Sequence, residues 1–232
     1  VVVVAPENKR ISQDILVPPV PKAKDKPQSG QVVMVEIIEQ PSKFSQPIGK
    51  IIEVLGNHAD PGMEIEIALR KHDLPFEFSK SALDENKALP DKVTKADLKG
   101  RVDLRDVALV TIDGETARDF DDAVYCEKKG RGWRLIVAIA DVSHYVKPGM
   151  ALDREAVERG NSVYFPRRVI PMLPEKLSNG ICSLNPDVER MAMVCDMEIS
   201  STGKIGKYKF YPAVFKSHAR LTYNLVWSWL SG

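Results

Sequence analysis

Four aspartates share one short stretch near the middle of this sequence: Asp113, Asp119, Asp121 and Asp122. Carboxylates this close in the chain repel one another at neutral pH, so a compact fold holds them only if cations neutralise them or if they fan out into water. Carboxylate oxygens are the ligands that hard divalent cations such as Mg²⁺ prefer. The cluster therefore predicts a metal site that all four aspartates help to form.

The residues around the aspartates favour the metal site over an exposed acidic turn. Phe120 and the apolar run Val107–Ile112 anchor the stretch in a core. Gly114 lets the chain turn sharply after Asp113. Asp121 and Asp122 are adjacent, so in extended geometry they point in opposite directions and serve two ions or two coordination shells.

Two other uses of clustered carboxylates fit less well. A calcium-binding EF-hand loop needs a glycine after its third acidic position, but Asp119-Phe120-Asp121 is followed by Asp122-Ala123-Val124. Any two carboxylates can act as a glycosidase pair, yet such a pair does not require four acids in one stretch. An exposed acidic turn stays as the alternative.

Three further features have two interpretations each. Arg118 either contacts a phosphate or forms a salt bridge that neutralises the cluster. Asp141, at the end of a strand pattern, is either a fifth carboxylate of the site or a turn residue. The run 164–168, Tyr-Phe-Pro-Arg-Arg, pairs aromatic rings with guanidinium groups as base-stacking sites do, although Tyr-Phe runs also fill cores.

The elements that must position these residues indicate a mixed α/β (α+β) fold. Residues 101–232 are expected to form a larger α/β domain, with a buried strand at Trp133–Ala140. Met191–Ile199 and Ile205–Phe215 flank the turn Ser-Ser-Thr-Gly, which predicts a hairpin. Helices are expected at 153–159, ending at Gly160, at 174–179 and after Thr222, whose side chain can cap the last one.

The N-terminal part has a different character. Residues 1–56 contain short strand patterns separated by Pro- and Gly-containing turns, with a Pro/Lys-rich loop at 18–30. This pattern is typical of a small β-barrel of the oligonucleotide-binding type, which serves either for RNA contact or only as a structural module. Residues 57–100 are expected to be a linker region, in which periodicity does not decide whether Met63–Leu69 is a strand or a helix.

Composition narrows the class of protein. The formal net charge is only +1, so any binding of a polyanion is expected to be confined to a local groove. Three unevenly spaced cysteines predict free thiols in a reducing compartment. Because there is no signal-peptide pattern and no apolar run of about 18 residues, a cytoplasmic protein without a membrane span is expected. Both ends fall within apolar elements, which indicates a piece of a longer protein.

Several runs of this sequence resemble, in order and at similar spacing, the catalytic domain of the RNase II family of exoribonucleases. They are Thr111–Ala123, Ala138–Ser143, Leu152–Ala156, Ser162–Pro166, Ile170–Glu175, Cys182–Pro186 and Ser217–Tyr223. Residues 1–56 are similar to a cold-shock domain of that family without its opening strand. The resemblance implies that 101–232 is the N-terminal part of this catalytic domain.

The resemblance also implies an activity. It is that of a processive, Mg²⁺-dependent 3′→5′ exoribonuclease that hydrolyses single-stranded RNA to nucleoside 5′-monophosphates. Asp113, Asp119, Asp121 and Asp122 would be the active-site aspartates, with Asp121 and Asp122 catalytic and Asp121 essential. Tyr164 would stack near the 3′-terminal base of the RNA.

Further parts of the family's active site would follow residue 232, so little or no nuclease activity is expected of these 232 residues alone. Two other functions stay open. One is an RNA-binding relative whose catalytic domain has degenerated, which loss of the aspartates would mark. The other is a metal-binding structural domain without affinity for RNA. No protein partner is predicted.

Overall fold

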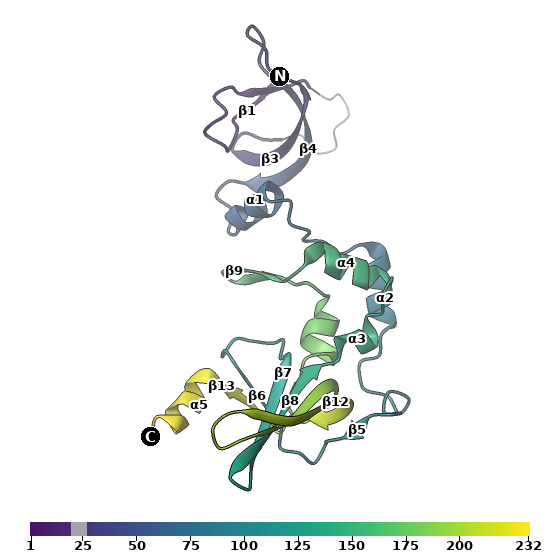
Figure 1. The fold of residues 1–232 in the computed structure, drawn as a ribbon. Helices are drawn as coiled ribbons and strands as arrows, with labels where there is room; N and C mark the ends of the chain where they lie inside the picture. Colours follow the sequence, from purple (N-terminus) through teal and green to yellow (C-terminus); the bar gives the residue numbers. More distant parts are fainter. Residues whose placement is uncertain (20–26) are drawn as a thin grey trace. The chain divides into compact units, whose positions relative to one another are not determined.

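A computed structural model describes residues 1–19 and 27–232, and it divides into two compact units, residues 1–74 and 75–232 (Figure 1). The middle of the predicted Pro/Lys-rich loop lies outside the described residues. The predicted domain limits after residues 56 and 100 stay predictions. Among the described residues, none of the helices has the length and apolar character that a membrane crossing needs.

The first unit is a four-stranded sheet followed by a helix. Its strands are β1 (Val2–Val4), β2 (Ile15–Val17), β3 (Gln31–Glu39) and β4 (Ile48–Asn57), in the order β1-β2-β4-β3. The apolar run that periodicity left undecided is helical, α1 (Met63–Lys71). Arg70 of this helix pairs with Glu53 of β4 at 2.5 Å, and Leu69 is fully buried, so α1 packs against the sheet.

The described strands of the predicted small barrel form an open sheet with β1 and β3 at its edges, not a closed one. Closing a barrel requires staggered edge strands long enough to pair with one another. Here β1 and β2 have three residues each, and the pairing of β3 with β4 shifts register at three points, which bends the longer strands. The short strands that the sequence predicts for this region are present.

The second unit is built on a seven-stranded sheet, and with it the predicted mixed α/β fold is confirmed. Its strand order is β13-β6-β7-β8-β11-β12-β5. The bounds are β5 Val102–Asp103, β6 Val110–Asp113, β7 Asp122–Lys129, β8 Gly132–Ala140, β11 Glu189–Ile199, β12 Ile205–Lys216 and β13 Ala219–Thr222. The central pairs are antiparallel, and β11 with β12 is the predicted hairpin. The outer strands β13 and β5 run parallel to β6 and β12.

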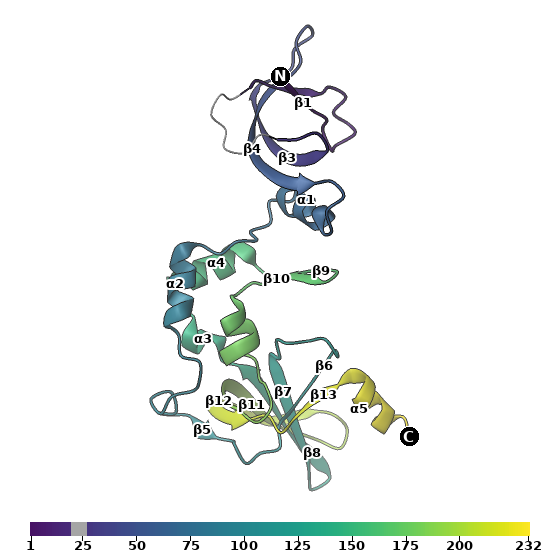
Figure 2. The ribbon, with the colours of Figure 1, turned by 180° about the vertical axis from the view of Figure 1, so that it is seen from behind.

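Helices and one small hairpin complete this unit (Figure 2). They are α2 (Lys80–Ala88), α3 (Val142–Tyr145), α4 (Ala151–Arg159), β9 (Val163–Phe165), β10 (Arg168–Ile170), η1 (Lys176–Ile181) and α5 (Tyr223–Leu230). In place of the helix predicted at 174–179 there is a π-helical element, Lys176–Ile181, in which the backbone at Gly180 leaves the helical region. The residues predicted to end α4 and to cap the start of α5 do so in the structure. Gly160 follows α4 with a φ of 73°, and Thr222 Oγ1 accepts the Leu225 N–H at the start of α5.

One glutamate joins α2 to α4. Both carboxylate oxygens of Glu85 accept N–H groups at the first turn of α4, from Ala151 and Leu152, at 2.9 Å each. These two bonds lower the pKa of Glu85. At the other end of α4, Arg159 donates to the carbonyl of Pro75 at 2.6 Å. Residues 75–88 are therefore held along α4.

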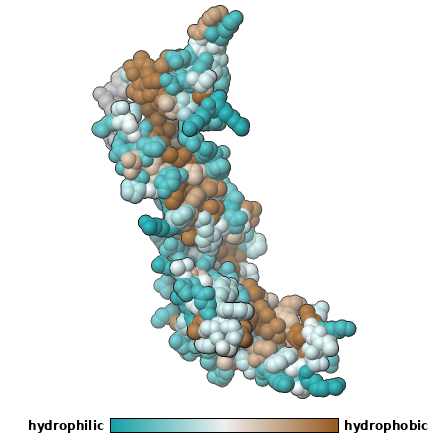
Figure 3. Space-filling model, turned by 90° about the vertical axis from the view of Figure 1, so that its left-hand side faces the viewer, coloured by the Kyte–Doolittle hydropathy of each residue, from teal (hydrophilic) through white to brown (hydrophobic). Residues whose placement is uncertain are grey.

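The two faces of the seven-stranded sheet differ in burial. On one face, small and branched side chains such as Ala123, Ile136 and Val194 are almost fully buried and form the core with Phe120 and Leu184. The alternate positions are far more exposed. They include Trp133, Ile139, Met193, Tyr208 and Phe210. Figure 3 shows apolar groups, in brown, that reach the surface of the protein. The four aspartates lie at one end of this sheet, in and around the loop between β6 and β7.

Candidate active site

The four aspartates lie where β6 ends and β7 begins. Asp113 is the last residue of β6 and Asp122 the first of β7, while Asp119 and Asp121 belong to the irregular loop between them. The two strands pair only at Val110 and Val124, so they diverge toward the loop. On the other side of β6, strand β13 fixes its end by pairing along all four residues.

The charges of the cluster act on Asp121. Burial raises the pKa of its carboxyl group, and the carboxylates of Asp119, Asp122 and Asp113 raise it further, in that order. All the contributions to this shift have the same sign, so within residues 1–19 and 27–232 no cationic side chain offsets the raised pKa. The fold therefore brings together the four residues that the sequence singled out, and leaves a concentration of negative charge there.

An oxygen-only donor set with uncompensated negative charge suits a hard divalent cation. Within residues 1–19 and 27–232, however, no three side chains of His, Cys, Asp or Glu converge into a metal-binding group. Asp113 Oδ1 instead accepts the N–H of Gly114 at 2.6 Å, and Asp119 Oδ2 accepts the hydroxyl of Tyr164 at 3.0 Å. The four carboxylates fit such a cation by the chemistry of their oxygen donors.

Tyr164 lies beside the cluster. It is the central residue of β9, opposite Val169 in β10, and 66% of its surface is exposed. It is therefore not a core residue. Burial of the hydroxyl, followed by its hydrogen bond to Asp119 and the charge of that carboxylate, raises the pKa of Tyr164. The ring offers an aromatic surface next to the carboxylates.

The structure decides between the two interpretations of Asp141, but it does not test a phosphate contact by Arg118. Arg118 is exposed, and in the described part of the chain its guanidinium forms no salt bridge to the cluster. A phosphate contact by Arg118 stays a prediction. Asp141 pairs with Arg101 at 2.5 Å and accepts the Ser143 hydroxyl at 2.8 Å. Burial opposes this ionised carboxylate, but the bonds from Arg101 and Ser143 lower its pKa overall. Asp141 is thus neutralised by a cation and is not a fifth ligand.

The sequence motifs did not reveal which residues hold the loop itself. Ser183 and Arg220 bind its backbone from two sides. Both belong to runs that resemble the RNase II family, but neither residue type carries a chemical signal of its own. Their role depends on contacts between segments far apart in the sequence.

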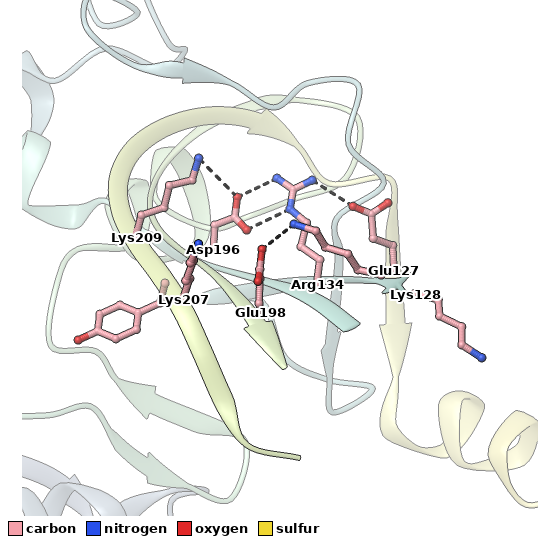
Figure 4. A pocket seen from close by; sticks show the side chains of 9 residues that line it. Glu127, Lys128, Arg134, Asp196, Glu198, Lys207 and Lys209 are labelled. Atoms are coloured by element: carbon pink, nitrogen blue, oxygen red, sulfur yellow. Dashed lines mark hydrogen bonds and ion pairs between the residues drawn. The ribbon is translucent and has the colours of Figure 1, made fainter. Parts of the chain in front are cut away.

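A second polar region lies at the opposite end of β7, where an open hollow of about 530 Å³ is lined by charged side chains (Figure 4). Arg134 pairs there with Asp196 at 2.7 Å and with Glu127 at 3.1 Å, and Lys129 pairs with Glu198 at 2.6 Å. Its acids are thus compensated by cations, in contrast to the aspartate cluster. The side chains that line this hollow form an ion-pair network on the surface, which links β7, β8 and β11.

Comparison with known proteins shows the family of this chain. The family model for the RNB domain matches residues 101–232, and that for the cold shock domain matches residues 4–79. Ribonuclease R of Escherichia coli is 56% identical over 232 residues, which is 99% of this chain and 28% of that protein. The chain thus spans about a quarter of the length of this relative.

Solved structures of similar fold include RNase R of Mycoplasma genitalium in complex with double-stranded RNA. It is 33% identical, with a TM-score of 0.88 over 96% of this chain and 39% of that one. The structure of yeast Ssd1, described as a pseudonuclease, shares the fold with a TM-score of 0.74 at 19% identity, over 99% of this chain and 30% of that one. Because the RNB model covers more than half of the sequence, including the aspartate cluster and Tyr164, the chain belongs to the RNB domain family.

Proposed function

We propose that the protein containing this chain is a hydrolytic exoribonuclease. It degrades single-stranded RNA processively from the 3′ end to nucleoside 5′-monophosphates and depends on Mg²⁺. The observation that carries the proposal is the group of uncompensated aspartates next to an exposed tyrosine ring in an RNB domain. The fold alone would not carry it, since yeast Ssd1 shares the fold and is described as a pseudonuclease.

The proposed roles follow from the chemistry of each side chain. Asp113, Asp119, Asp121 and Asp122 would hold Mg²⁺, with Asp121 and Asp122 closest to the reaction. The ion, when bound, would neutralise charge on the scissile phosphate and stabilise the entering and leaving oxygens. Tyr164 would stack on the terminal base, and Arg118 would contact a phosphate. Three free cysteines agree with the reducing cytoplasm as the place of action.

End-labelled RNA tests the direction, the products and the metal dependence. With the natural protein that carries this chain, a 3′ label is expected to leave at once as mononucleotide, whereas a 5′ label stays on progressively shorter RNA. EDTA is expected to stop both, and added Mg²⁺ to restore them. Internal cleavage products, release of the 5′ label first, or full activity in EDTA would each contradict the proposal.

Tyr164→Ala is expected to weaken use of RNA substrates. Stacking of one base on an aromatic side chain contributes about 1–3 kcal/mol, so KM should rise about 5- to 150-fold. Tyr164→Phe keeps the ring and should keep KM near the wild-type value. The measurement is steady-state degradation of a single-stranded oligonucleotide by both variants. Equal KM values for the alanine and phenylalanine variants would show that the ring does not bind RNA.

A further inference from the structure

The loop from Gly114 to Asp121 carries two of the four aspartates and contains neither a strand nor a helix. Its two carboxylates carry like charges and repel one another. A loop of this kind would relax outward unless its backbone were bound to other parts of the fold. The backbone contacts of the loop therefore decide where Asp119 and Asp121 stand relative to Asp113.

Ser183 binds the loop on both sides of Asp119. Its hydroxyl accepts the N–H of Phe120 at 3.0 Å and donates to the carbonyl of Arg118 at 2.8 Å. The side chain is fully buried, so water does not compete for these bonds. Ser183 is itself fixed, because Arg190 Nε donates to its carbonyl at 2.6 Å. The peptide groups before and after Asp119 are thus attached to one buried oxygen.

Arg220 binds the earlier half of the loop. Its Nη2 donates to the carbonyls of Glu115 and Ala117 at 2.7 and 3.1 Å. Its guanidinium carbon lies 5.0 Å from the centre of the Phe120 ring, within the range of a cation–π contact. Arg220 belongs to β13, the strand that pairs with β6 up to Asp113. One strand therefore fixes Asp113 through its backbone and the loop through a side chain.

We infer that Ser183 and Arg220 are positioning residues that fix the backbone of the loop carrying Asp119 and Asp121, so that these aspartates can bind a divalent cation together with Asp113 and Asp122. The inference rests on the proposed function, because it assigns these residues a part in the same site. Ser183 is fully buried, and the two printed hydrogen bonds of the Arg220 guanidinium go to carbonyls of the loop. Their loss should lower metal affinity and turnover while leaving RNA binding unchanged. Changes next to metal ligands commonly cost about 10- to 100-fold in metal affinity or activity.

The first test compares Ser183→Ala with Ser79→Ala in the natural protein that carries this chain. Ser79 offers a matched control because its hydroxyl also accepts a backbone N–H, that of Ala82, in α2 and away from the aspartates. We expect Ser183→Ala to weaken Mn²⁺ binding, followed by electron paramagnetic resonance without RNA, about 10- to 100-fold. It should lower kcat by a similar factor at limiting Mg²⁺, with KM for RNA unchanged and kcat partly restored at high Mg²⁺. Ser79→Ala should change none of these.

The second test keeps the inference falsifiable if Ser183→Ala folds poorly. Arg220→Gln removes two arginine–carbonyl bonds, and Arg154→Gln removes a similar bond to Gly149 on the surface of α4. Arg220→Gln is expected to weaken Mn²⁺ binding, Arg154→Gln to leave it unchanged, and Arg220→Lys to give an intermediate value. Thermal unfolding of each variant shows how much of an effect comes from stability alone.

The outcomes separate this inference from the proposed function. If Ser183→Ala and Arg220→Gln bind Mn²⁺ as tightly as the wild type, the positioning role is wrong. The same holds if their losses match those of the two controls at equal stability. If Asp121→Asn degrades RNA at the wild-type rate, the proposed function itself is wrong. Loss of activity in Asp121→Asn with full activity in Ser183→Ala overturns the inference and leaves the function standing.

Discussion

Asp121→Asn is expected to abolish RNA degradation while RNA binding persists. Asparagine has the size of aspartate but no charge, so it removes the negative charge of a metal ligand without leaving a hole. Removing one group that stabilises transition-state charge commonly costs about 10²–10³ in kcat, and we expect at least this loss. Degradation and binding of single-stranded RNA are measured on the same preparation, in the natural protein that carries this chain.

A stability measurement accompanies this test. Asp121 is the member of the cluster on which burial and the three other carboxylates act together. Replacing it with a neutral residue relieves that repulsion, so the variant should unfold at a higher temperature than the wild type in the absence of Mg²⁺. Asp106→Asn, at an exposed aspartate before β6, serves as the control and should change neither activity nor stability. An inactive variant that also no longer binds RNA would contradict the assigned role.

Breaking the buried pair between Arg101 and Asp141 is expected to cost about 3–5 kcal/mol in the free energy of unfolding, because Asp141→Asn leaves the guanidinium buried without a counter-charge. Both side chains are less than a tenth exposed. The double variant Arg101→Met/Asp141→Leu removes both charges and should recover most of the loss. Urea unfolding of the wild type, of Asp141→Asn and of the double variant measures this. Equal losses in the double and the Asp141→Asn variants would contradict the account.

The same pair gives stability a dependence on pH. The pKa of Asp141 is lowered in the folded state, so this carboxylate stabilises the fold above its unfolded value of about 3.9. The contribution is lost as the pH falls below that value through the folded pKa. In Arg101→Met/Asp141→Leu, the part of acid unfolding that this carboxylate causes should therefore be absent.

The sequence predicted well those elements that are determined by residues close together in the chain. The turn before Ile205 and the cap Thr222 were predicted because turn and capping residues act within a few positions. Clustering of the aspartates was visible because they are neighbours in the chain. The interpretation of Asp141 stayed open because its partner Arg101 lies 40 residues away. That the small N-terminal sheet is open could not be predicted, because composition does not show whether the edge strands pair.

The carboxylate of Glu85 affects how the second unit unfolds locally. Its two acceptors satisfy N–H groups 66 and 67 residues further along the chain, at the start of α4. If α2 detaches in a native-state fluctuation, these donors lose their partners, so the first turn of α4 is destabilised at the same moment. The two helices consequently behave as one cooperative folding unit, although α2 precedes the region that the RNB model matches. A truncation that begins at Arg101 would remove half of that unit.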